Sequence, residues 1–503
     1  MIYQEQDLVT VAKRENNTKR NYLIVNRRQG KHIPVCPKEA LEMFSALADI
    51  VRQAYRNERL LIIGFAETAT AIGAAVAVEL GQYYIQTTRE NVEGVDDYVY
   101  FTEAHSHATE QKVVRADVES VVCGRKNTYG GQTDGTVVTM EEPLKPIDRI
   151  VFIEDEVTTG NTILSAIEKI EELETIKAIE KAHGSKLCFS VASILNGMDS
   201  AAEAIFQKRQ IPLHYLVKID HAKYPQLAEN YRGDGNYMNC SNDESESRVK
   251  LEDSEINQFG EINGINEIKE IKEIKEIINE TNRIKEIREI NETDRIKEIN
   301  KINKNNFGAN KLNNVYYLKD NTNSICFNSA CSDINYINNK CYYIDDFDNR
   351  CFIKEFTVEG CRNARRIQDA KVYQNACEQL CQKICAQIEP PDQILVLGTE
   401  EFMYPALLLA AKLEEQGKSV RFHATTRSPI AVSTESEYPL HARYELASIY
   451  DNQRRTFVYN LAAYNAVIII SDAPITSAEG KNSIYKALAH SGNQNITLVQ
   501  WKE

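Results

Sequence analysis

The stretch RIVFIEDEVTTGNTIL, residues 149–164, constrains the fold of this chain more than any other segment. Four apolar residues are followed at once by three acids, and then by a loop that is rich in threonine and contains one glycine. A uniformly apolar run of this length is typical of a central strand in a parallel sheet, because such a strand is buried on both faces. Helical periodicity begins directly after the loop. The stretch therefore predicts a strand, a polar turn and a helix.

Short apolar runs alternate with amphipathic segments through the first half of the chain. The apolar runs predict strands at residues 60–64, 83–87, 98–101, 149–153, 187–194 and 213–219. The amphipathic segments predict helices at residues 39–55, 69–80 and 162–173. Strands that alternate with helices form a mostly parallel sheet that is covered on both faces. We therefore expect an α/β domain.

Polar residues stand where the strand at 149–153 ends. Ligands bind at the carboxyl ends of strands in such sheets, and carboxylates there, Glu154 and Asp155, can accept hydrogen bonds from sugar hydroxyls directly or through hydrated Mg²⁺. The next residues combine hydroxyl donors with a helix start, which suits a phosphate. They are Thr158, Thr159, Gly160, Asn161 and Thr162. An ordinary strand-to-helix turn with a threonine cap is the alternative. The whole string predicts a sugar-phosphate site.

Beyond these inferences, VFIEDEVTTGNT resembles the phosphoribosyl-diphosphate (PRPP) signature of type I phosphoribosyltransferases. Other segments are similar to the phosphoribosyltransferase of tellurite-resistance operons and its appended TRSP domain. They are NYLIVNRRQGKHIPVCP (21–37), LLIIGFAETATAIG (60–73), TEAHSHAT (102–109) and the C-terminal region. The resemblance covers about residues 20–237 and 340–503. It implies a type I phosphoribosyltransferase-like parallel sheet flanked by helices.

The resemblance also implies a role for each motif. It makes Glu154 and Asp155 the catalytic pair that holds the ribose 2- and 3-hydroxyls, with Asp155 reaching a metal indirectly through PRPP and water. It assigns the 5-phosphate to residues 158–162. It assigns the diphosphate to Gly64, Phe65, Ala66, Glu67 and Thr68. A mobile flap would contain His105, Ser106 and His107. Mg²⁺ is the implied cofactor.

Two acids depart from the family pattern. Glu156 stands where the family usually has an apolar residue, and Glu67 lies in the implied diphosphate loop. A negative charge in these places opposes the binding of an anion, so neutralisation has to come from other groups. The candidates are Mg²⁺, the helix start after Ala66, Arg28, Lys31, Arg89, Lys112 and the two flap histidines.

The C-terminal region repeats the plan of the first half. Residues 393–430 parallel residues 59–90, and AVIIISDAPITS (466–477) is similar to IVFIEDEVTTGN. When Asp472 is aligned with Asp155, Ser471, Ala473 and Ser477 take the places of the first acid, the third acid and the glycine. Pro474 also removes a backbone donor. We expect a second, degenerate phosphoribosyltransferase-like α/β domain without PRPP turnover. It could bind another ligand, cover the first site or form an interface.

Residues 238–339 differ in composition from both flanking regions. They are rich in Asn, Glu, Ile and Lys and contain the near-duplicates NETNRIKEIREI and NETDRIKEINKI. Isoleucine recurs at every third residue, so an apolar stripe on a helix would drift by about 60° per step. We expect a low-complexity insertion, disordered or a solvated helix, between domains at 20–237 and 340–503; partner binding or a coiled coil is the alternative.

Charge and cysteine content exclude several classes of protein. The net charge of -14 disfavours nucleic acid as a partner, and no apolar run reaches the length of about 18 residues that a membrane helix needs. No basic and apolar leader begins the sequence, so we expect a cytoplasmic location. Twelve cysteines form no CxxC pair. Cys377, Cys381 and Cys385 share one helix face and predict a buried stripe, with a metal or redox site as the alternative.

The predicted function is transfer of a 5-phosphoribosyl group from PRPP to a small acceptor with release of diphosphate. The resemblance places it in nucleoside-like metabolite synthesis linked to tellurite or stress resistance. A PRPP-binding regulator or pseudoenzyme is the first alternative, and an interaction protein is the second. A homodimer and enzymes of the same operon are candidate partners. The sequence does not identify the acceptor.

Overall fold

The computed structural model describes residues 2–15, 20–101, 111–125, 132–133, 136–137, 144–184, 186–241, 334–337, 340–344, 350–474 and 477–503 of the chain. These residues belong to one structural unit, Met1–Ser241 with Cys331–Glu503. The predicted flap residues His105, Ser106 and His107 lie outside the described residues. Most of the predicted insertion at 238–339 also lies outside them.

The first large sheet is parallel except at one edge, and its strand order is β11-β10-β9-β3-β4-β16. The strands are β3 (Leu60–Gly64), β4 (Tyr83–Gln86), β9 (Arg149–Val157), β10 (Cys188–Asn196), β11 (Leu213–Lys218) and the short antiparallel β16 (Gln368–Asp369). All five residues of β3 are buried, as are residues 150–153 of β9. The uniformly apolar runs therefore mark the central strands, and the predicted α/β sheet is confirmed.

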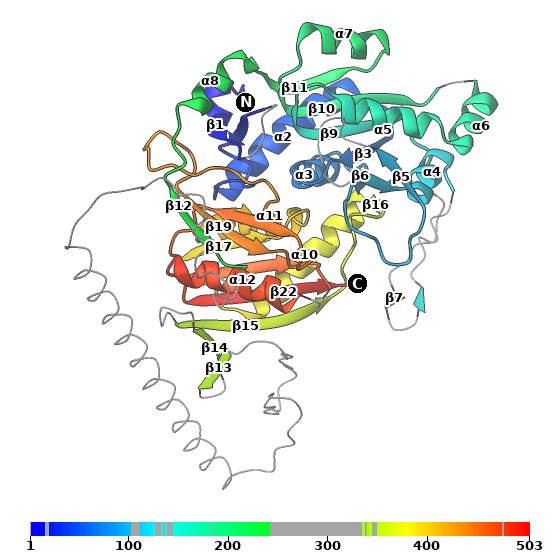
Figure 1. Cartoon of the computed structure of the whole chain (residues 1–503). Coiled ribbons are helices and arrows are strands. Elements are labelled where there is room, and N and C mark those ends of the chain that lie inside the picture. The colour runs from blue at the N-terminus through cyan, green and yellow to red at the C-terminus, as the bar shows by residue number, and fades with distance from the viewer. Residues whose placement is uncertain are drawn as a thin grey trace, which may run out of the picture. The chain divides into compact units, whose positions relative to one another are not determined.

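Helices connect these strands and cover the sheet (Figure 1). They are α2 (Pro37–Ala54), α3 (Thr70–Leu80), α4 (Arg115–Cys123), α5 (Asn161–Glu171), α6 (Glu174–His183) and α7 (Ser200–Lys208). The sequence of α3, TAIGAAVAVEL, is apolar on almost every side. This composition fits its position, because α3 packs on β3 and β4 and also against helices of the C-terminal half.

The second large sheet has the order β13-β14-β15-β22-β21-β17-β18. Its strands are β13 (Ile334–Ile337), β14 (Lys340–Ile344), β15 (Arg350–Glu359), β17 (Gln393–Gly398), β18 (Ser419–Ala424), β21 (Ala466–Ser471) and β22 (Asn495–Lys502). The parallel order β18-β17-β21-β22 reproduces β4-β3-β9-β10. Gly64 pairs with Ile153 and Gly398 with Ile470, so Asp472 occupies the position of Asp155. The predicted second α/β domain is confirmed.

Four helices join the two halves. In each half an 18-residue helix precedes the first parallel strand, α2 in one and α10 (Ala370–Gln387) in the other. The helix after that strand is α3 or α11 (Tyr404–Glu415). α2 contacts α11, α10 contacts α3, and α3 contacts α11. These contacts are exchanged when the halves are exchanged, so the halves are arranged about an approximate two-fold axis (Figure 1).

One hydrophobic core runs through both halves and includes residues from all four of these helices. Cys377 and Cys381 are fully buried in it, and Cys385 packs against it. This position agrees with the predicted buried cysteine stripe. A second core belongs to the C-terminal half and packs against α12 (Ala478–His490).

Each half inserts an antiparallel hairpin between its second and third core strands. In the first half it is β5 (Tyr98–Phe101) and β6 (Gln111–Val114), and in the second it is β19 (Ala442–Ala447) and β20 (Arg455–Tyr459). Thr88 bridges to Lys112 of the first hairpin, and Thr426 bridges to Phe457 of the second. The loop between β19 and β20 therefore takes the place of the predicted flap.

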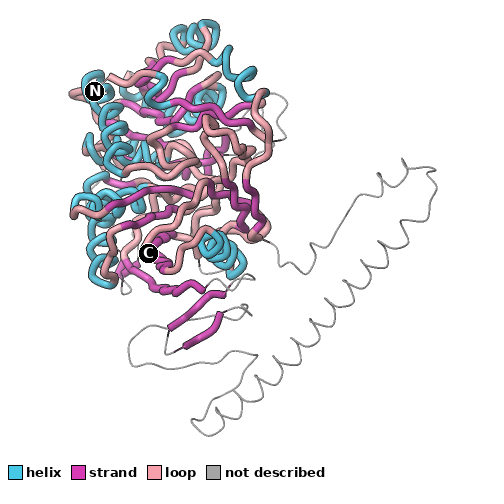
Figure 2. The backbone as a smooth tube through the Cα atoms, turned by 90° about the vertical axis from the view of Figure 1, so that its left-hand side faces the viewer, coloured by secondary structure: helices cyan, strands magenta, loops and turns pink. Residues whose placement is uncertain are grey.

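Short elements complete the described chain, whose helices, strands and loops are distinguished by colour in Figure 2. They are α1 (Glu5–Leu8), β1 (Val9–Lys13), β2 (Tyr22–Asn26), β7 (Gln132–Thr133), β8 (Thr136–Val137), η1 (His221–Lys223), α8 (Tyr224–Glu229) and β12 (Asn236–Asn239). β12 pairs with β19, so residues 236–239 join a sheet of the C-terminal half. In the described part of the chain, we find no helix with the length and apolar character needed to cross a membrane.

Candidate functional site

The candidate site lies where the loops after β3 and β9 meet. These two strands are neighbours, and the chain leaves them in opposite directions, to β4 on one side and to β10 on the other. Such a switch point leaves a crevice at the carboxyl edge of a parallel sheet. Thr68 Oγ1 donates a hydrogen bond of 2.9 Å to Asp155 Oδ1 across it. The structure thus brings Asp155 of the predicted acid pair and Thr68 of the predicted diphosphate loop together.

The acid pair lies within a strand. β9 continues to Val157, whereas the apolar run predicted an end at residue 153. The reason is that β10 runs alongside to Asn196, with Ser193 paired to Glu154 and Leu195 to Glu156. Alternation along a strand places Asp155 on the face opposite to both glutamates. Asp155 is therefore the acid that faces the loop after β3.

Asp155 is in an environment that opposes its ionisation. Burial raises the pKa of this carboxyl group, and the charge of Glu156 raises it further. The hydrogen bond from Thr68 acts in the opposite direction, because it stabilises the ionised form. Burial and Glu156 thus raise the pKa of Asp155, and the hydrogen bond from Thr68 opposes them.

The loop at 158–162 leads into the start of α5. Gly160 is the N-cap and has a φ of 70°. A Cβ atom there would lie 2.4 Å from Phe206 Cζ, so the position requires glycine. Thr159 and Asn161 are exposed, and Thr158 and Thr162 are partly exposed. Gly160 offers no side chain to cap the helix, and Asn161 N donates a long hydrogen bond of 3.4 Å to Thr159 Oγ1. This arrangement is suited to an anion.

The equivalent helix of the C-terminal half is capped by its own residue. Ser477 is the N-cap of α12, and its side chain accepts a hydrogen bond of 2.9 Å from Gly480 N. Ser477 stands at the position that the sequence alignment gives to Gly160. A backbone N–H group at the start of the second helix is thus hydrogen-bonded by the side chain of the N-cap residue.

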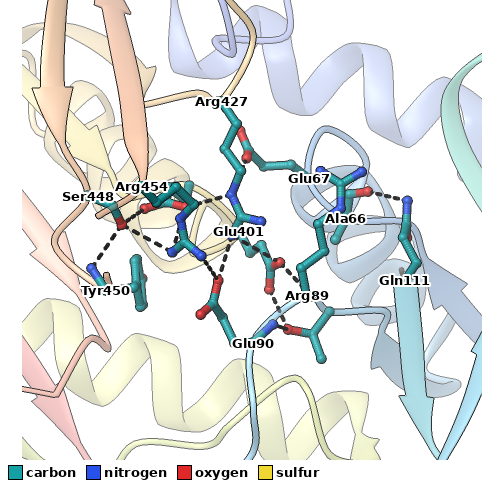
Figure 3. Close-up of polar contacts among 12 residues, drawn as sticks. Ala66, Glu67, Arg89, Glu90, Gln111, Glu401, Arg427, Ser448, Tyr450 and Arg454 are labelled. Atoms are coloured by element: carbon teal, nitrogen blue, oxygen red, sulfur yellow. Dashed lines mark hydrogen bonds and ion pairs between the residues drawn. The ribbon is translucent and has the colours of Figure 1, made fainter. Parts of the chain in front are cut away.

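The loop after β3 is held by the neighbouring strand and hairpin. Ala66 N donates to Thr87 Oγ1 at 2.8 Å, and Gln111 Nε2 donates to Ala66 O at 2.8 Å (Figure 3). Gln111 is the first residue of β6 and directly follows the predicted flap segment. Phe65 N donates to Ile153 O at 3.1 Å. The loop therefore contacts β9, the residue that follows β4 and the first residue of β6.

Glu67 in this loop is buried but not isolated. It forms an ion pair with Lys31, and its Oε2 lies 3.2 Å from Nε of Arg427, a residue of the C-terminal half. Burial would raise the pKa of Glu67, but the charges of Lys31 and Arg427 outweigh burial and lower it to about 2. Lys31 was among the candidates for this role, whereas sequence reasoning missed Arg427. The only signal in the sequence was the repeated segment Thr-Thr-Arg. This repeat does not predict that the arginine of one half contacts the glutamate of the other half.

The other candidate cations contact other groups. Arg28 Nη1 lies 3.8 Å from Glu39 Oε2 at the start of α2. Lys112 Nζ donates to Asn91 Oδ1 at 2.5 Å and lies 4.4 Å from the centre of the Tyr98 ring. The backbone N–H of Arg89 donates to Glu401 Oε1 at 3.0 Å. The two flap histidines are outside the described residues.

Glu156, the other unusual acid, also has a counter-charge. Arg20 Nη2 lies 2.6 Å from Glu156 Oε1 and 3.0 Å from Oε2. His221 Nε2 lies 3.3 Å from the same carboxylate, and its Nδ1 is 2.6 Å from Tyr22 OH. Burial, followed by the charge of Arg20, lowers the pKa of His221 to about 4. Arg20 therefore supplies the positive charge that Glu156 needs.

The strand ends of the C-terminal half are filled by side chains. Tyr450 OH donates to Asp472 Oδ1 at 2.6 Å, and Arg365 forms an ion pair with the same carboxylate. Thr399 Oγ1 lies 3.0 Å from Ser471 Oγ. Tyr450 belongs to the loop between β19 and β20, which takes the place of the flap. The loop thus closes over the second site.

The described residues include no group of three or more His, Cys, Asp or Glu side chains that could hold a metal ion. Asp155 offers one carboxylate beside the loop after β3. Mg²⁺ commonly takes one or two carboxylates from a protein and the rest of its ligands from substrate phosphates and water. The residues present fit that mode of binding.

Two family models match the sequence. One describes a phosphoribosyl transferase and matches residues 8–221, and the other describes a TRSP domain C-terminal to it and matches residues 359–488. The chain therefore contains a domain of this phosphoribosyltransferase family, followed by a TRSP domain. The resemblance that the sequence motifs indicated is therefore confirmed. The residues around Asp155 lie in the phosphoribosyltransferase domain, and those around Asp472 lie in the TRSP domain.

Solved structures with similarity to this chain include adenine and orotate phosphoribosyltransferases. The Trypanosoma brucei adenine enzyme, in complex with AMP, pyrophosphate and ribose-5-phosphate, is 15% identical, with coverage of 42% of this chain and 76% of that chain and a TM-score of 0.26. The Giardia lamblia adenine enzyme, complexed with 9-deazaadenine, is 12% identical, with coverage of 43% and 96% and a TM-score of 0.26. The Aeropyrum pernix orotate enzyme is 14% identical, with coverage of 43% and 90% and a TM-score of 0.24. No curated protein matches the chain.

Proposed function

We propose that the protein transfers a 5-phosphoribosyl group from PRPP to a small acceptor and releases diphosphate. The observation that carries the proposal is the hydrogen bond of 2.9 Å between Thr68 and Asp155. It joins the diphosphate loop to the acid pair in a domain of the phosphoribosyltransferase family. The helix start at Gly160 follows the same strand and supplies the third part of the site.

Each part takes one portion of PRPP. Asp155 holds the ribose hydroxyls, residues 158–162 and the start of α5 hold the 5-phosphate, and residues 64–68 hold the diphosphate. Glu154 lies on the other face of β9, and its share in holding the ribose stays a prediction. The bond between the anomeric carbon and a diphosphate oxygen breaks, and the acceptor forms the new bond to that carbon. Positive charge develops on the sugar as diphosphate leaves. The protein contributes by positioning and by fixed charges near the sugar.

Mg²⁺ would be held by PRPP and, through water, by Asp155. When bound, it neutralises charge on the departing diphosphate. The carboxylate of Asp155 must be ionised for this role and for accepting hydrogen bonds from the ribose. Its raised pKa therefore makes substrate binding sensitive to acid.

A PRPP-binding regulator is the alternative reading of the same site. Neutralisation of Glu67 by Lys31 and Arg427, and of Glu156 by Arg20, removes the main reason to regard the site as degenerate. This favours transfer. The acceptor, the link to tellurite or stress resistance, a homodimer, operon-encoded partners and a cytoplasmic location stay predictions.

Calorimetric titration of the protein with PRPP in the presence of Mg²⁺ tests binding. Transfer is tested by incubating the protein with PRPP, Mg²⁺ and a cell extract and searching for a ribose-phosphate adduct by mass spectrometry. Asp155→Asn should abolish adduct formation. Asp148→Asn is the matched control, because Asp148 is exposed and precedes the opposite end of β9. A wild-type protein that binds no PRPP overturns the proposal. Binding without diphosphate release for any acceptor favours the regulator.

A further inference from the structure

Glu67 places a carboxylate in the loop to which diphosphate would bind. Only 8% of this residue is exposed, so water does little to screen its charge. A diphosphate that approaches the loop is repelled unless positive groups remain beside Glu67. The origin of these groups therefore decides whether the loop can function.

Both counter-charges of Glu67 depend on the C-terminal half. Arg427 belongs to that half, and its backbone N–H also lies 3.3 Å from Glu67 Oε1 (Figure 3). Lys31 belongs to the first half but is held there by two C-terminal carbonyl groups. Its Nζ donates to Glu400 O at 2.9 Å and to Thr425 O at 3.0 Å. Without the C-terminal half, Glu67 would lose its ion pair with Arg427 and keep an unanchored Lys31 and the charge of Arg89, which is the smallest of the three effects on its pKa.

The contact is reciprocal. By the register of β17 with β3, Glu401 takes the position of Glu67, and by the register of β18 with β4, Arg427 takes the position of Arg89. Glu401 Oε1 accepts from Arg89 N at 3.0 Å, and Glu401 Oε2 accepts from Thr88 Oγ1 at 2.7 Å. Each loop glutamate is thus bound by the Thr-Thr-Arg segment of the other half. These reciprocal contacts are those that an approximate two-fold axis between the halves produces.

The C-terminal half keeps these cross-contacts although its own strand ends are filled. Tyr450 and Arg365 occupy the carboxylate of Asp472, and Ser477 caps the helix that follows. Groups that would bind a sugar phosphate in this half are therefore engaged with one another. The C-terminal half therefore contributes to the first half through its contacts with Glu67 and Lys31, beside the diphosphate loop.

We propose that the TRSP domain is a built-in second half of the substrate site, in which Arg427 neutralises Glu67 and holds the diphosphate loop in its binding shape. The inference rests on the proposed function. It assigns a role to the TRSP domain, which contributes no residue to the substrate site as proposed above. Arg427 is a positioning residue in this scheme, because it acts on PRPP through Glu67 and the loop.

Arg427 also stabilises the interface itself, and a test has to separate the two effects. Its side chain lies 2.7 Å from Glu400 Oε2 and 2.6 Å from Glu90 Oε1. Arg454 binds the same two carboxylates, at 3.1 Å and 2.9 Å, but forms no ion pair with Glu67 in the part of the chain that the structure describes (Figure 3). Arg454→Gln is therefore the matched control for damage to the interface.

The experiment measures the dissociation constant of PRPP with Mg²⁺ for the full-length wild type and for four variants that circular dichroism shows to be folded. They are Arg427→Gln, Glu67→Gln, the double variant Glu67→Gln/Arg427→Gln, and Arg454→Gln. Arg427→Gln should weaken binding by about tenfold or more, the effect expected for one unit charge left unpaired near the diphosphate. The double variant should return to within about threefold of the wild type, and Arg454→Gln should bind as the wild type does.

Arg427→Gln with wild-type affinity overturns the inference, as does a double variant that is no better than Arg427→Gln. If Arg427→Gln does not fold, Arg427→Lys decides, because lysine keeps the charge but loses the planar fork that binds Glu67 and Glu90 together. It should bind PRPP at least about threefold more weakly, and equal affinity overturns the inference. A folded wild type that binds no PRPP overturns the proposed function instead.

Discussion

Thr68 and Asp155 are 87 residues apart in the sequence and are joined by a hydrogen bond of 2.9 Å from hydroxyl to carboxylate. The bond connects the loop after β3 to the strand β9, and β3 and β9 are adjacent in the first sheet. It supplies one of the interactions that favour an ionised Asp155 in a partly buried place. The electrostatics of the site therefore depend on a contact between the loop after one strand and a residue of the neighbouring strand.

Thr68→Val should shift PRPP binding to higher pH. Valine keeps the shape of threonine but removes the donor, so the pKa of Asp155, already raised by burial and by Glu156, should rise further. The pH at which binding is half-maximal on the acid side should increase. Titration of PRPP and Mg²⁺ between pH 4 and 7 measures this shift.

The control for this variant is Thr175→Val. Thr175 Oγ1 also donates to a carboxylate at 2.9 Å, that of Glu119, but it lies on α6. Its removal should leave the pH profile of PRPP binding unchanged. An unshifted acid limb in Thr68→Val would show that the hydrogen bond has no part in the ionisation of Asp155.

Glu156→Gln should lower the pH at which PRPP binding is half-maximal on the acid side, the opposite of the effect of Thr68→Val. The charge of Glu156 contributes to the raised pKa of Asp155, so its removal should lower that pKa and extend PRPP binding to more acidic solutions. The exposed Glu172→Gln at the end of α5 serves as the comparison. A limb that stays in place, or moves to higher pH, contradicts the assigned coupling between the two adjacent acids.

Gly160→Ala should destabilise the protein more than Gly184→Ala does. Both glycines have a φ of 70°, so both substitutions carry the left-handed cost of about 1–2 kcal/mol. A Cβ at Gly160 would also press on Phe206 and Met198, whereas a Cβ at Gly184 meets no described atom within 4 Å. The overpacked contact should add about 1–3 kcal/mol. Urea unfolding of the two variants gives the difference, and equal midpoints would refute the steric argument.

His221 should make stability depend on pH between its ordinary pKa of 6.5 and about 4. The folded state binds fewer protons in this window than the unfolded state, because burial and Arg20 lower the pKa of the buried imidazole. The free energy of unfolding should therefore be highest above pH 6.5 and fall toward pH 4, with a contribution on the order of 2 kcal/mol. His221→Gln should have the shallower pH dependence in urea unfolding. Identical slopes for the two proteins would rule out this role for His221.

The repeated strand order could be predicted because short-range patterns carry it. The apolar runs that became β3 and β17 each end in glycine and are followed by an acidic loop and a helix, and the runs at β9 and β21 share the aspartate at the position of Asp155 and Asp472. The register of both sheets then places Asp472 at the position of Asp155. Local propensity and burial on both faces were sufficient for this part of the fold.

The end of β9 and the neutralisation of two acids could not be predicted in the same way. β9 continues through Glu154, Asp155 and Glu156 because β10 offers backbone partners beyond the apolar run. Arg20 reaches Glu156 from the loop before β2, 136 residues away in the chain. Backbone pairing between strands and ion pairs between distant segments produce no periodic pattern in the sequence, so the sequence does not predict them.

The sequence by itself determined that this chain builds two related parallel sheets and that the first carries the acid pair, the glycine turn and the loop of a phosphoribosyltransferase domain. Only the tertiary structure decided which cations stand beside Glu67, because Arg427 belongs to the other half and reaches it across the approximate two-fold interface. The reason is physical: the hydrophobic pattern of a strand is local, whereas the charge balance of a buried carboxylate depends on whatever the fold packs against it.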